Sequence, residues 1–473
     1  MKKIICILLA VLLSIVCLSA CETKEFLGDD DLSGIVTDPE LEVELKFRYW
    51  SGTNDNFIME QIISEFEEQN PKTKINKEFS TGNYFPTLLT DFASGIEPDV
   101  FFMQPSEMAT FIDSGYLMAL NYFVDNSDVF TKEDMWEFND QVFRYDGTQY
   151  GQGNTYGLIK DWSPDFMLIY NKDLIDYARA HVDPDLPEIS STEPITWDDF
   201  ENIAKAVNQL GEGEYAEYSK YKEGVLSAPY KGTIMDFNPY EQMAQFIVQN
   251  DGTLYSEDFK SVTLDDPNTV AAIEKFVELQ YGDDAAAPFV SSMQDSTALT
   301  EFARGKVAMI MCGKWFFTSY PFGVDFDYGV APPPMPEGKT TPVAISTGLV
   351  GMAASSGTQY PDRAWDFIEF MMTRGQEILA ENNYNIPGNK TIANQMFEDA
   401  SDPKMKEIND VFKYMMNNNY IKTVPLNPYM SNTQFNGTMK NKIEAVLDDQ
   451  LTLTQALSEA KQILEQIISD VAY

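Results

Sequence analysis

Strands and helices alternate along the chain, and this alternation limits the possible folds more than any other feature of the sequence. Apolar residues alternate with charged ones over 43–49, which predicts a half-buried strand. The unbroken apolar run 100–103 lies between helical patterns and fits a parallel strand buried on both faces. The sequence therefore predicts βαβ order and an α/β fold class. The first predicted elements are a strand over 43–49, a helix ending at Asn70-Pro71, a strand over 74–79, a helix over 84–93 and a strand over 100–103.

Later segments repeat this order. A strand over 166–170 precedes a helix that Thr196 caps, with Asp199 at the capping-box position. Another helix begins at Asp266-Pro267, a strand covers 306–311, and an amphipathic helix near 453–467 ends the pattern.

The length and the net charge of the chain limit the classes of protein to which it can belong. A chain of 473 residues has room for two or three domains, and its 44% hydrophobic content is sufficient for large cores. The formal net charge of −41 disfavours nucleic acid and predicts a soluble monomer. The single histidine, His181, makes a catalytic triad or a multi-histidine metal site a poor hypothesis. We predict no cofactor and no metal site.

The first 21 residues carry the most specific local motif. Lys2 and Lys3 precede an apolar stretch, 4–16, that is too short for a comfortable transmembrane helix. Leu18-Ser19-Ala20-Cys21 resembles the lipobox of bacterial lipoproteins. The resemblance implies a signal peptide over 1–20, lipidation of Cys21 and anchoring at the extracellular face of a bacterial cell membrane, or in the periplasm of a Gram-negative cell. The alternative is an ordinary signal peptide followed by a chance cysteine.

The next segment, 21–40, is acidic and contains no sustained periodicity. We interpret it as a flexible tether between the anchor and the folded body. A calcium loop at 29–31 is a weaker alternative, because the alternate-residue ligands and terminal glutamate of an EF-hand are missing.

The order of the later motifs resembles one family, the extracellular solute-binding proteins of family 1, which are the maltose-binding-like components of ABC importers. The resemblance extends from residue 43 to residue 468. It rests on the strand, loop and helix of 50–71, the run 95–100 with 115–117, the run 156–158 with Leu168-Ile169-Tyr170-Asn171-Lys172-Asp173-Leu174, Thr196-Trp197, the segment 302–315 and the segment 364–368.

The resemblance implies a type II periplasmic-binding-protein fold, with two α/β lobes joined by crossing strands near 167–172, 343–350 and 400–425. Lobe 1 would comprise 41–168 and 349–403, and lobe 2 would comprise 169–348 and 404–473. Such lobes close over a ligand, and closure requires only a higher affinity of the closed state. The partners implied are a carbohydrate, expected to be an oligosaccharide, and the subunits of an ABC permease.

Sugars have apolar faces that aromatic rings cover and a rim of hydroxyls that carboxylates and amides bind. Trp315, beside Gly313, is the first candidate because it follows a strand and matches a family stacking position. Trp50 ends the first strand. For both tryptophans, packing in the core is the alternative. The other candidates are Tyr84, Gln104, Ser106, Glu107, Asp161, Trp162, Asp236, Asn238, Tyr240, Thr347, Gly348 and Tyr429.

Several of these candidates have a structural alternative. Asn238 suits a helix N-cap as well as a ligand contact, and Asp161-Trp162 suits ordinary packing. Ser106 and Glu107 stand where the family's maltose receptors have a carboxylate and a basic residue, which argues against a maltodextrin ligand.

Two other classes of protein stay open at this point. A surface glycoside hydrolase needs only two carboxylates, and 74 acidic residues do not exclude such a pair. A surface adhesin or assembly lipoprotein would share the lipobox but would have no ligand cleft. The motif order favours a binding protein that is not an enzyme.

Overall fold

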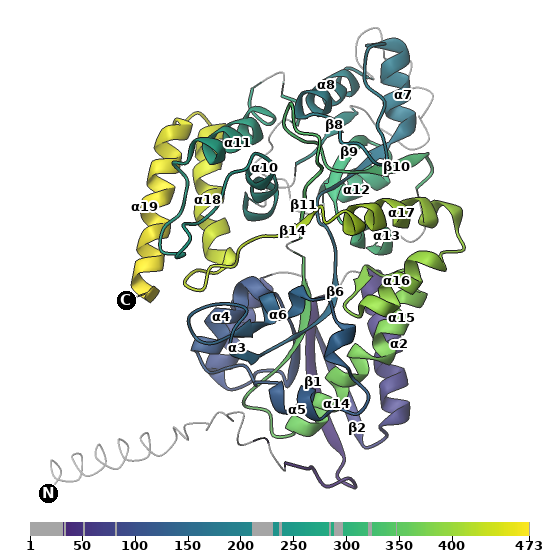
Figure 1. Cartoon of the computed structure of the whole chain (residues 1–473), viewed down its shortest axis with the longest axis vertical. Helices are drawn as coiled ribbons and strands as arrows, with labels where there is room; N and C mark the ends of the chain where they lie inside the picture. Colours follow the sequence, from purple (N-terminus) through teal and green to yellow (C-terminus); the bar gives the residue numbers. More distant parts are fainter. Residues whose placement is uncertain are drawn as a thin grey trace, which may run out of the picture.

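The computed structural model describes residues 32, 35–50, 53–80, 83–210, 230–235, 239–282, 285–287, 297–319, 324–346 and 348–472. Their elements form two lobes stacked along the long axis of the molecule, each around its own sheet (Figure 1). The predicted signal peptide and Cys21 lie outside the described residues. No helix in the described part of the chain is long and apolar enough to cross a membrane.

Lobe 1 is built on a six-stranded sheet of order β13-β6-β12-β3-β1-β2. β1 pairs in parallel with β2 and β3, whereas β12 runs antiparallel to β3 and β6. The predicted βαβ order is therefore confirmed, and the α/β class with it. The strands are β1 (Val43–Trp50), β2 (Thr73–Ser80), β3 (Val100–Met103), β6 (Leu158–Trp162), β12 (Val350–Ala354) and β13 (Ile386–Pro387).

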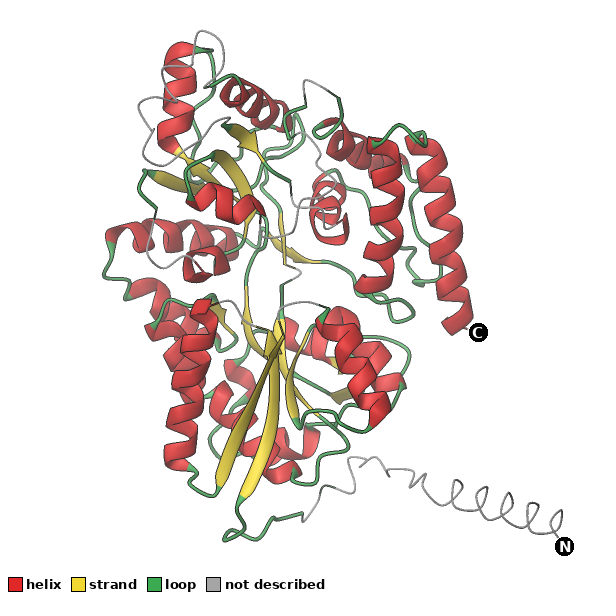
Figure 2. Cartoon of the chain, turned by 180° about the vertical axis from the view of Figure 1, so that it is seen from behind, coloured by secondary structure: helices red, strands yellow, loops and turns green. Residues whose placement is uncertain are grey.

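Helices cover both faces of this sheet (Figure 2). The alternation predicted in β1 places Val43, Leu45, Phe47 and Tyr49 in the core. The helical elements are α2 (Thr53–Gln69), α3 (Tyr84–Ser94), α4 (Pro105–Asp113), α5 (Asn121–Asn126), η2 (Lys132–Asp134), α6 (Phe138–Phe143), α14 (Pro361–Met372), α15 (Arg374–Glu381) and α16 (Lys390–Glu398), and a short ladder joins β4 (Arg144–Tyr145) to β5 (Asn154–Thr155).

Lobe 2 is built on a four-stranded sheet of order β10-β7-β9-β8. The predicted capping box is present, because Thr196 Oγ1 accepts from the Asp199 N–H and the Asp199 carboxylate accepts from the Thr196 N–H, both at 3.0 Å. The elements are β7 (Met167–Asn171), β8 (Lys231–Thr233), β9 (Val307–Cys312), β10 (Tyr328–Ala331), α7 (Lys172–His181), α8 (Trp197–Asn208), η4 (Pro239–Met243), α10 (Ala244–Gln249), α11 (Pro267–Glu278), α12 (Thr297–Ala303), α13 (Trp315–Ser319), α17 (Pro403–Asn417), α18 (Asn432–Leu447) and α19 (Leu453–Ala472).

The chain crosses between the sheets three times. It passes from lobe 1 to lobe 2 between β6 and β7, returns between β11 (Ala344–Ser346) and β12, and passes again after α16. β14 (Ile421–Thr423) then pairs in parallel with β11 between the lobes (Figure 1). The residue boundaries of the lobes given above stay a prediction.

The C-terminal part of the segment 21–40 packs against lobe 1. Leu32 is fully buried in the lobe 1 core. The backbone N–H and the hydroxyl of Thr37 both donate to the carboxylate of Asp362 on α14, at 2.7 and 2.6 Å. Leu32 and Thr37, which were predicted to belong to a flexible tether, are therefore packed against lobe 1.

Candidate ligand-binding site

Trp50 ends the first strand of lobe 1, as predicted, and its ring lies in an aromatic cluster. The half-buried Trp50 ring meets the rings of Tyr84 and Phe102 edge to face, with centroids 4.8 and 5.3 Å apart. The Tyr84 hydroxyl lies 3.0 Å from the carbonyl oxygens of both Arg48 and Phe102, and burial raises its pKa. Tyr84 therefore joins β1 to β3 and supports Trp50, and its predicted ligand contact stays untested.

Asp161 is buried in a polar network that the sequence indicated only in part. Its carboxylate forms an ion pair with Lys160, and it accepts a 2.6 Å hydrogen bond from Asn385 Nδ2. Lys160 Nζ also lies 4.7 Å from the Phe102 ring and 4.6 Å from the Tyr384 ring, which is cation–π geometry. The side chains of Lys160 and Asp161 are only 1% and 2% exposed.

Sequence reasoning missed Lys160, Tyr384 and Asn385 as members of this network. The signal for Lys160 was available, because it interrupts the apolar run that becomes β6. Tyr384 and Asn385 reach the network only because β13 pairs with β6 across more than 200 residues of chain.

Trp162, the neighbour of Asp161, packs among lobe 1 rings. Its ring lies 5.4 Å from that of Trp136 and 4.9 Å from that of Phe138, both edge to face. The buried Trp162 Nε1–H has no hydrogen-bond partner among the described residues. The predicted ligand contact of Trp162 stays a prediction.

Trp315 begins α13 in lobe 2, directly after Gly313 and Lys314. A Cβ on Gly313 would lie 2.7 Å from two atoms of the Trp315 ring and 2.5 Å from Ser163 Oγ, so the turn requires glycine. Ser163 Oγ also accepts a 2.8 Å hydrogen bond from the backbone N–H of Lys314. α13 in turn contacts α2 of lobe 1, so Trp315 lies where the lobes meet.

Gln104, Ser106 and Glu107 follow β3, as predicted. Gln104 stands at the N-cap of α4 without a side-chain cap, and Ser106 lines a small cavity with Ser346 and Asn432. Glu107 is engaged by lobe 2, because its Oε1 accepts hydrogen bonds from the N–H and the hydroxyl of Thr433 at 3.1 and 2.8 Å.

The remaining predicted residues lie at the crossings or outside the described part. The Gly348 N–H donates a 2.5 Å hydrogen bond to Asp165 Oδ2. Tyr429 is half-buried against the lobe 2 core, and its N–H donates to Asn427 Oδ1. Asp236, Asn238 and Thr347 are outside the described residues, and only the backbone of Tyr240, in η4, is described.

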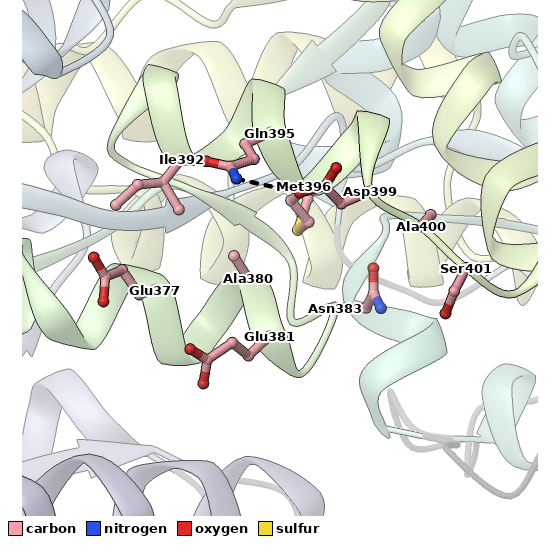
Figure 3. A pocket seen from close by; sticks show the side chains of 10 residues that line it. All are labelled: Glu377, Ala380, Glu381, Asn383, Ile392, Gln395, Met396, Asp399, Ala400 and Ser401. Atoms are coloured by element: carbon pink, nitrogen blue, oxygen red, sulfur yellow. Dashed lines mark hydrogen bonds between the residues drawn. The ribbon is translucent and has the colours of Figure 1, made fainter.

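Two cavities lie near this lobe junction. One, of about 190 Å³, is lined by Gln141 and Tyr150 from lobe 1 and by Phe259 and Pro428 from lobe 2. The other, of about 430 Å³, lies between α15 and α16 beside the third crossing (Figure 3). Its carboxylates include Glu377 and Glu381, which Arg374 neutralises.

The described residues thus form two α/β lobes that meet through aromatic rings, amides and paired charges. They contain no group of three or more histidine, cysteine or carboxylate side chains suited to a metal ion. Rings and hydrogen-bonding groups between two lobes joined by crossing strands define a two-lobed binding protein.

Comparison with known proteins gives the family. The model of the bacterial extracellular solute-binding proteins matches residues 49–378, and the chain belongs to this family. The resemblance inferred from the motifs is therefore confirmed.

Solved structures share the fold over nearly the whole chain. A structure of an ABC substrate-binding protein from Listeria monocytogenes in complex with cycloalternan has a TM-score of 0.74 at 22% identity, covering 91% of this chain and 100% of that one. The GacH receptor of Streptomyces glaucescens, whose structures include a complex with acarbose, has a TM-score of 0.71 at 20% identity, covering 91% and 100%. The maltotriose-bound MalE domain of Bdellovibrio bacteriovorus has a TM-score of 0.71 at 17% identity, covering 90% and 100%.

Proposed function

We propose that this protein is a lipid-anchored receptor of an ABC importer that captures an oligosaccharide between its lobes and delivers it to a permease. The observation that carries the proposal is that each lobe places a tryptophan at the end of a strand, Trp50 at the end of β1 and Trp315 after β9, and that α13, which begins with Trp315, contacts α2 of lobe 1. Aromatic rings suit the apolar faces of sugars, and carboxylates and amides suit their hydroxyls. The relatives bound to cycloalternan, acarbose and maltotriose support the same class of ligand.

The proposed ligand contacts are those predicted from the sequence. Trp50 and Trp315 supply ring faces, Asp161 accepts from sugar hydroxyls, and the Trp162 Nε1–H donates. The other proposed contacts are Tyr84, Gln104, Ser106, Glu107, Asp236, Asn238, Tyr240, Gly313, Thr347, Gly348 and Tyr429.

The proposal includes capture without chemistry and attachment to the membrane through acyl chains on Cys21. Two or more acyl chains would give stable anchoring where one chain gives only reversible binding. The strong negative charge supports a monomer at the cell surface.

Glycan titration tests the proposal. The body 21–473, with Cys21 replaced, is titrated against a panel of neutral oligosaccharides while tryptophan fluorescence and melting temperature are recorded. A micromolar ligand at millimolar concentration should stabilise the folded protein by about 4 kcal/mol. A response to amino acids or peptides, with none to any glycan, would refute the sugar assignment. Release of shorter glycans after long incubation would instead indicate a hydrolase.

A further inference from the structure

One carboxylate links the lobes on the side where α4 meets the first turn of α18. Glu107 is 4% exposed, and its Oε1 accepts both the N–H and the hydroxyl of Thr433. We propose that Glu107 is a positioning residue for ligand capture, which holds the N-terminus of α18 in the closed state and does not touch the ligand. This inference rests on the proposed function, and it reassigns Glu107 from the contacts given above.

In the first turn of α18, one backbone N–H has no acceptor within the helix, and Glu107 supplies that acceptor. A capping box already pairs Ser431 with Gln434, with N–H to side-chain oxygen distances of 3.0 and 3.3 Å. The Thr433 N–H, at the second helical position, has no acceptor within its own helix. A carboxylate at this end of a 16-residue helix also interacts favourably with the helix dipole.

The two partners belong to separately packed bodies. α4 packs into the lobe 1 core through Met108 and Phe111, whereas α18 packs into the lobe 2 core through Phe435 and Met439. Separation of the lobes about the crossing strands would therefore break both hydrogen bonds at once and return the carboxylate to water. The contact therefore depends on the arrangement of the two lobes seen in this structure.

The surroundings of Glu107 make the contact sensitive to pH. Burial raises the pKa of the Glu107 carboxyl, although the hydroxyls and N–H of Thr433 and Ser431 act in the opposite direction. The titratable group that faces it is Tyr150, whose own pKa is raised by burial, so that it stays neutral. No lysine or arginine of the described residues forms an ion pair with Glu107.

The direction of the pH dependence follows because the Glu107 carboxyl binds its proton more tightly in the closed state than in the open state. In the open state Glu107 is solvated and titrates near its ordinary value of about 4.3. The closed state is therefore favoured at a pH below that value, and this advantage is lost as the pH rises through the raised pKa. The protonated carboxyl still accepts from Thr433 through its carbonyl oxygen.

The test uses the full chain without added ligand between pH 5 and 8. Hydrogen exchange at the first turn of α18 and the radius of gyration report closure, and melting temperature reports folding. Glu107→Ala should raise the exchange rate at Thr433 about tenfold and enlarge the radius of gyration. Glu107→Gln, which keeps the acceptor without a charge, should stay closed and lose the pH dependence. Glu133→Gln, at an exposed lobe 1 glutamate, is the matched control and should behave as wild type.

Several outcomes would overturn the inference. One is unchanged exchange and radius of gyration in folded Glu107→Ala, and another is a wild-type pH profile in Glu107→Gln. If Glu107→Ala does not fold, Thr433→Val removes one of the two bonds, and unchanged exchange in that variant overturns the inference equally. Because closure is measured without a glycan, a failure of every glycan to bind would refute the proposed function and leave this test intact.

Discussion

The ammonium group of Lys314, in lobe 2, donates a 3.0 Å hydrogen bond to the carbonyl oxygen of Asn383, in lobe 1. The Lys314 side chain is fully buried, and no carboxylate of the described residues forms an ion pair with it. Asn383 adopts a left-handed backbone conformation with φ of 48° just after α15, which turns its carbonyl out of the helix. A buried amine thus bridges the lobes beside Trp315.

Lys314 should make the stability of the closed protein depend on pH. Burial lowers the pKa of Lys314 from 10.5 to about 7. The unfolded chain therefore binds this proton more tightly, and the free energy of unfolding should rise as the pH increases from 7 to 10. The difference between the two pKa values limits this rise in the free energy of unfolding to about 5 kcal/mol. Urea unfolding at each pH should show that Lys314→Met loses the rise.

The matched control for Lys314 is Lys406→Met. Lys406 is half exposed and pairs with Asp410 on the same helix. Its replacement should leave the pH profile parallel to that of wild type, because an exposed pair contributes less than about 1 kcal/mol. Parallel profiles for wild type and Lys314→Met would contradict the prediction.

Gly313→Ala should weaken ligand binding more than it weakens the fold. The added methyl group would lie within 2.7 Å of the Trp315 ring and of Ser163 Oγ, so the ring must move. Overpacking of this kind costs about 1–3 kcal/mol. We expect glycan affinity, measured by titration of tryptophan fluorescence, to fall at least tenfold, with a melting temperature that falls by only a few degrees.

Gly437→Ala provides the control for this substitution. Gly437 lies on α18, and nothing lies within 4 Å of the position that its Cβ would occupy. Alanine is the better helix former by about 1 kcal/mol, so this variant should be slightly more stable and bind as wild type. Equal glycan affinity of the two alanine variants would show that Trp315 is not positioned for the ligand by Gly313.

The sequence predicted most of the fold because the two periodicities are strong locally. Alternation in β1 and the apolar run of β3 set which faces are buried, and the capping box at Thr196 set the start of α8. These features depend on neighbours within a few residues. The lobe order came from the family resemblance, since no local pattern states which strands share a sheet.

The site was less predictable because its contacts join distant segments. Glu107 follows β3 as predicted, yet its acceptor role depends on Thr433, 326 residues further along the chain. Asn385 reaches Asp161 only after β13 has added to the sheet edge, 224 residues further along the chain. Residue type and position after a strand were sufficient to propose Asp161, but could not reveal which side chains would neutralise it.

Removing the Asp161 carboxylate should destabilise the fold strongly. Asp161→Ala leaves the ammonium of Lys160 buried without a counter-charge, which costs about 3–5 kcal/mol. The double variant Lys160→Met/Asp161→Ala should recover part of this loss, because it buries no unpaired charge. Urea unfolding of the three variants, including Lys160→Met alone, gives the coupling energy. Additive effects of the two single substitutions would contradict the prediction.

Tyr84→Phe should separate the structural role of Tyr84 from a role in binding. The hydroxyl is directed to the Arg48 and Phe102 carbonyl oxygens within lobe 1, so its loss should lower the free energy of unfolding by about 1–2 kcal/mol. The ring is retained and continues to support Trp50, so we expect glycan affinity within about twofold of wild type. Urea unfolding and glycan titration on the same samples check both expectations. A loss of affinity with unchanged stability would instead place the Tyr84 hydroxyl in contact with the ligand.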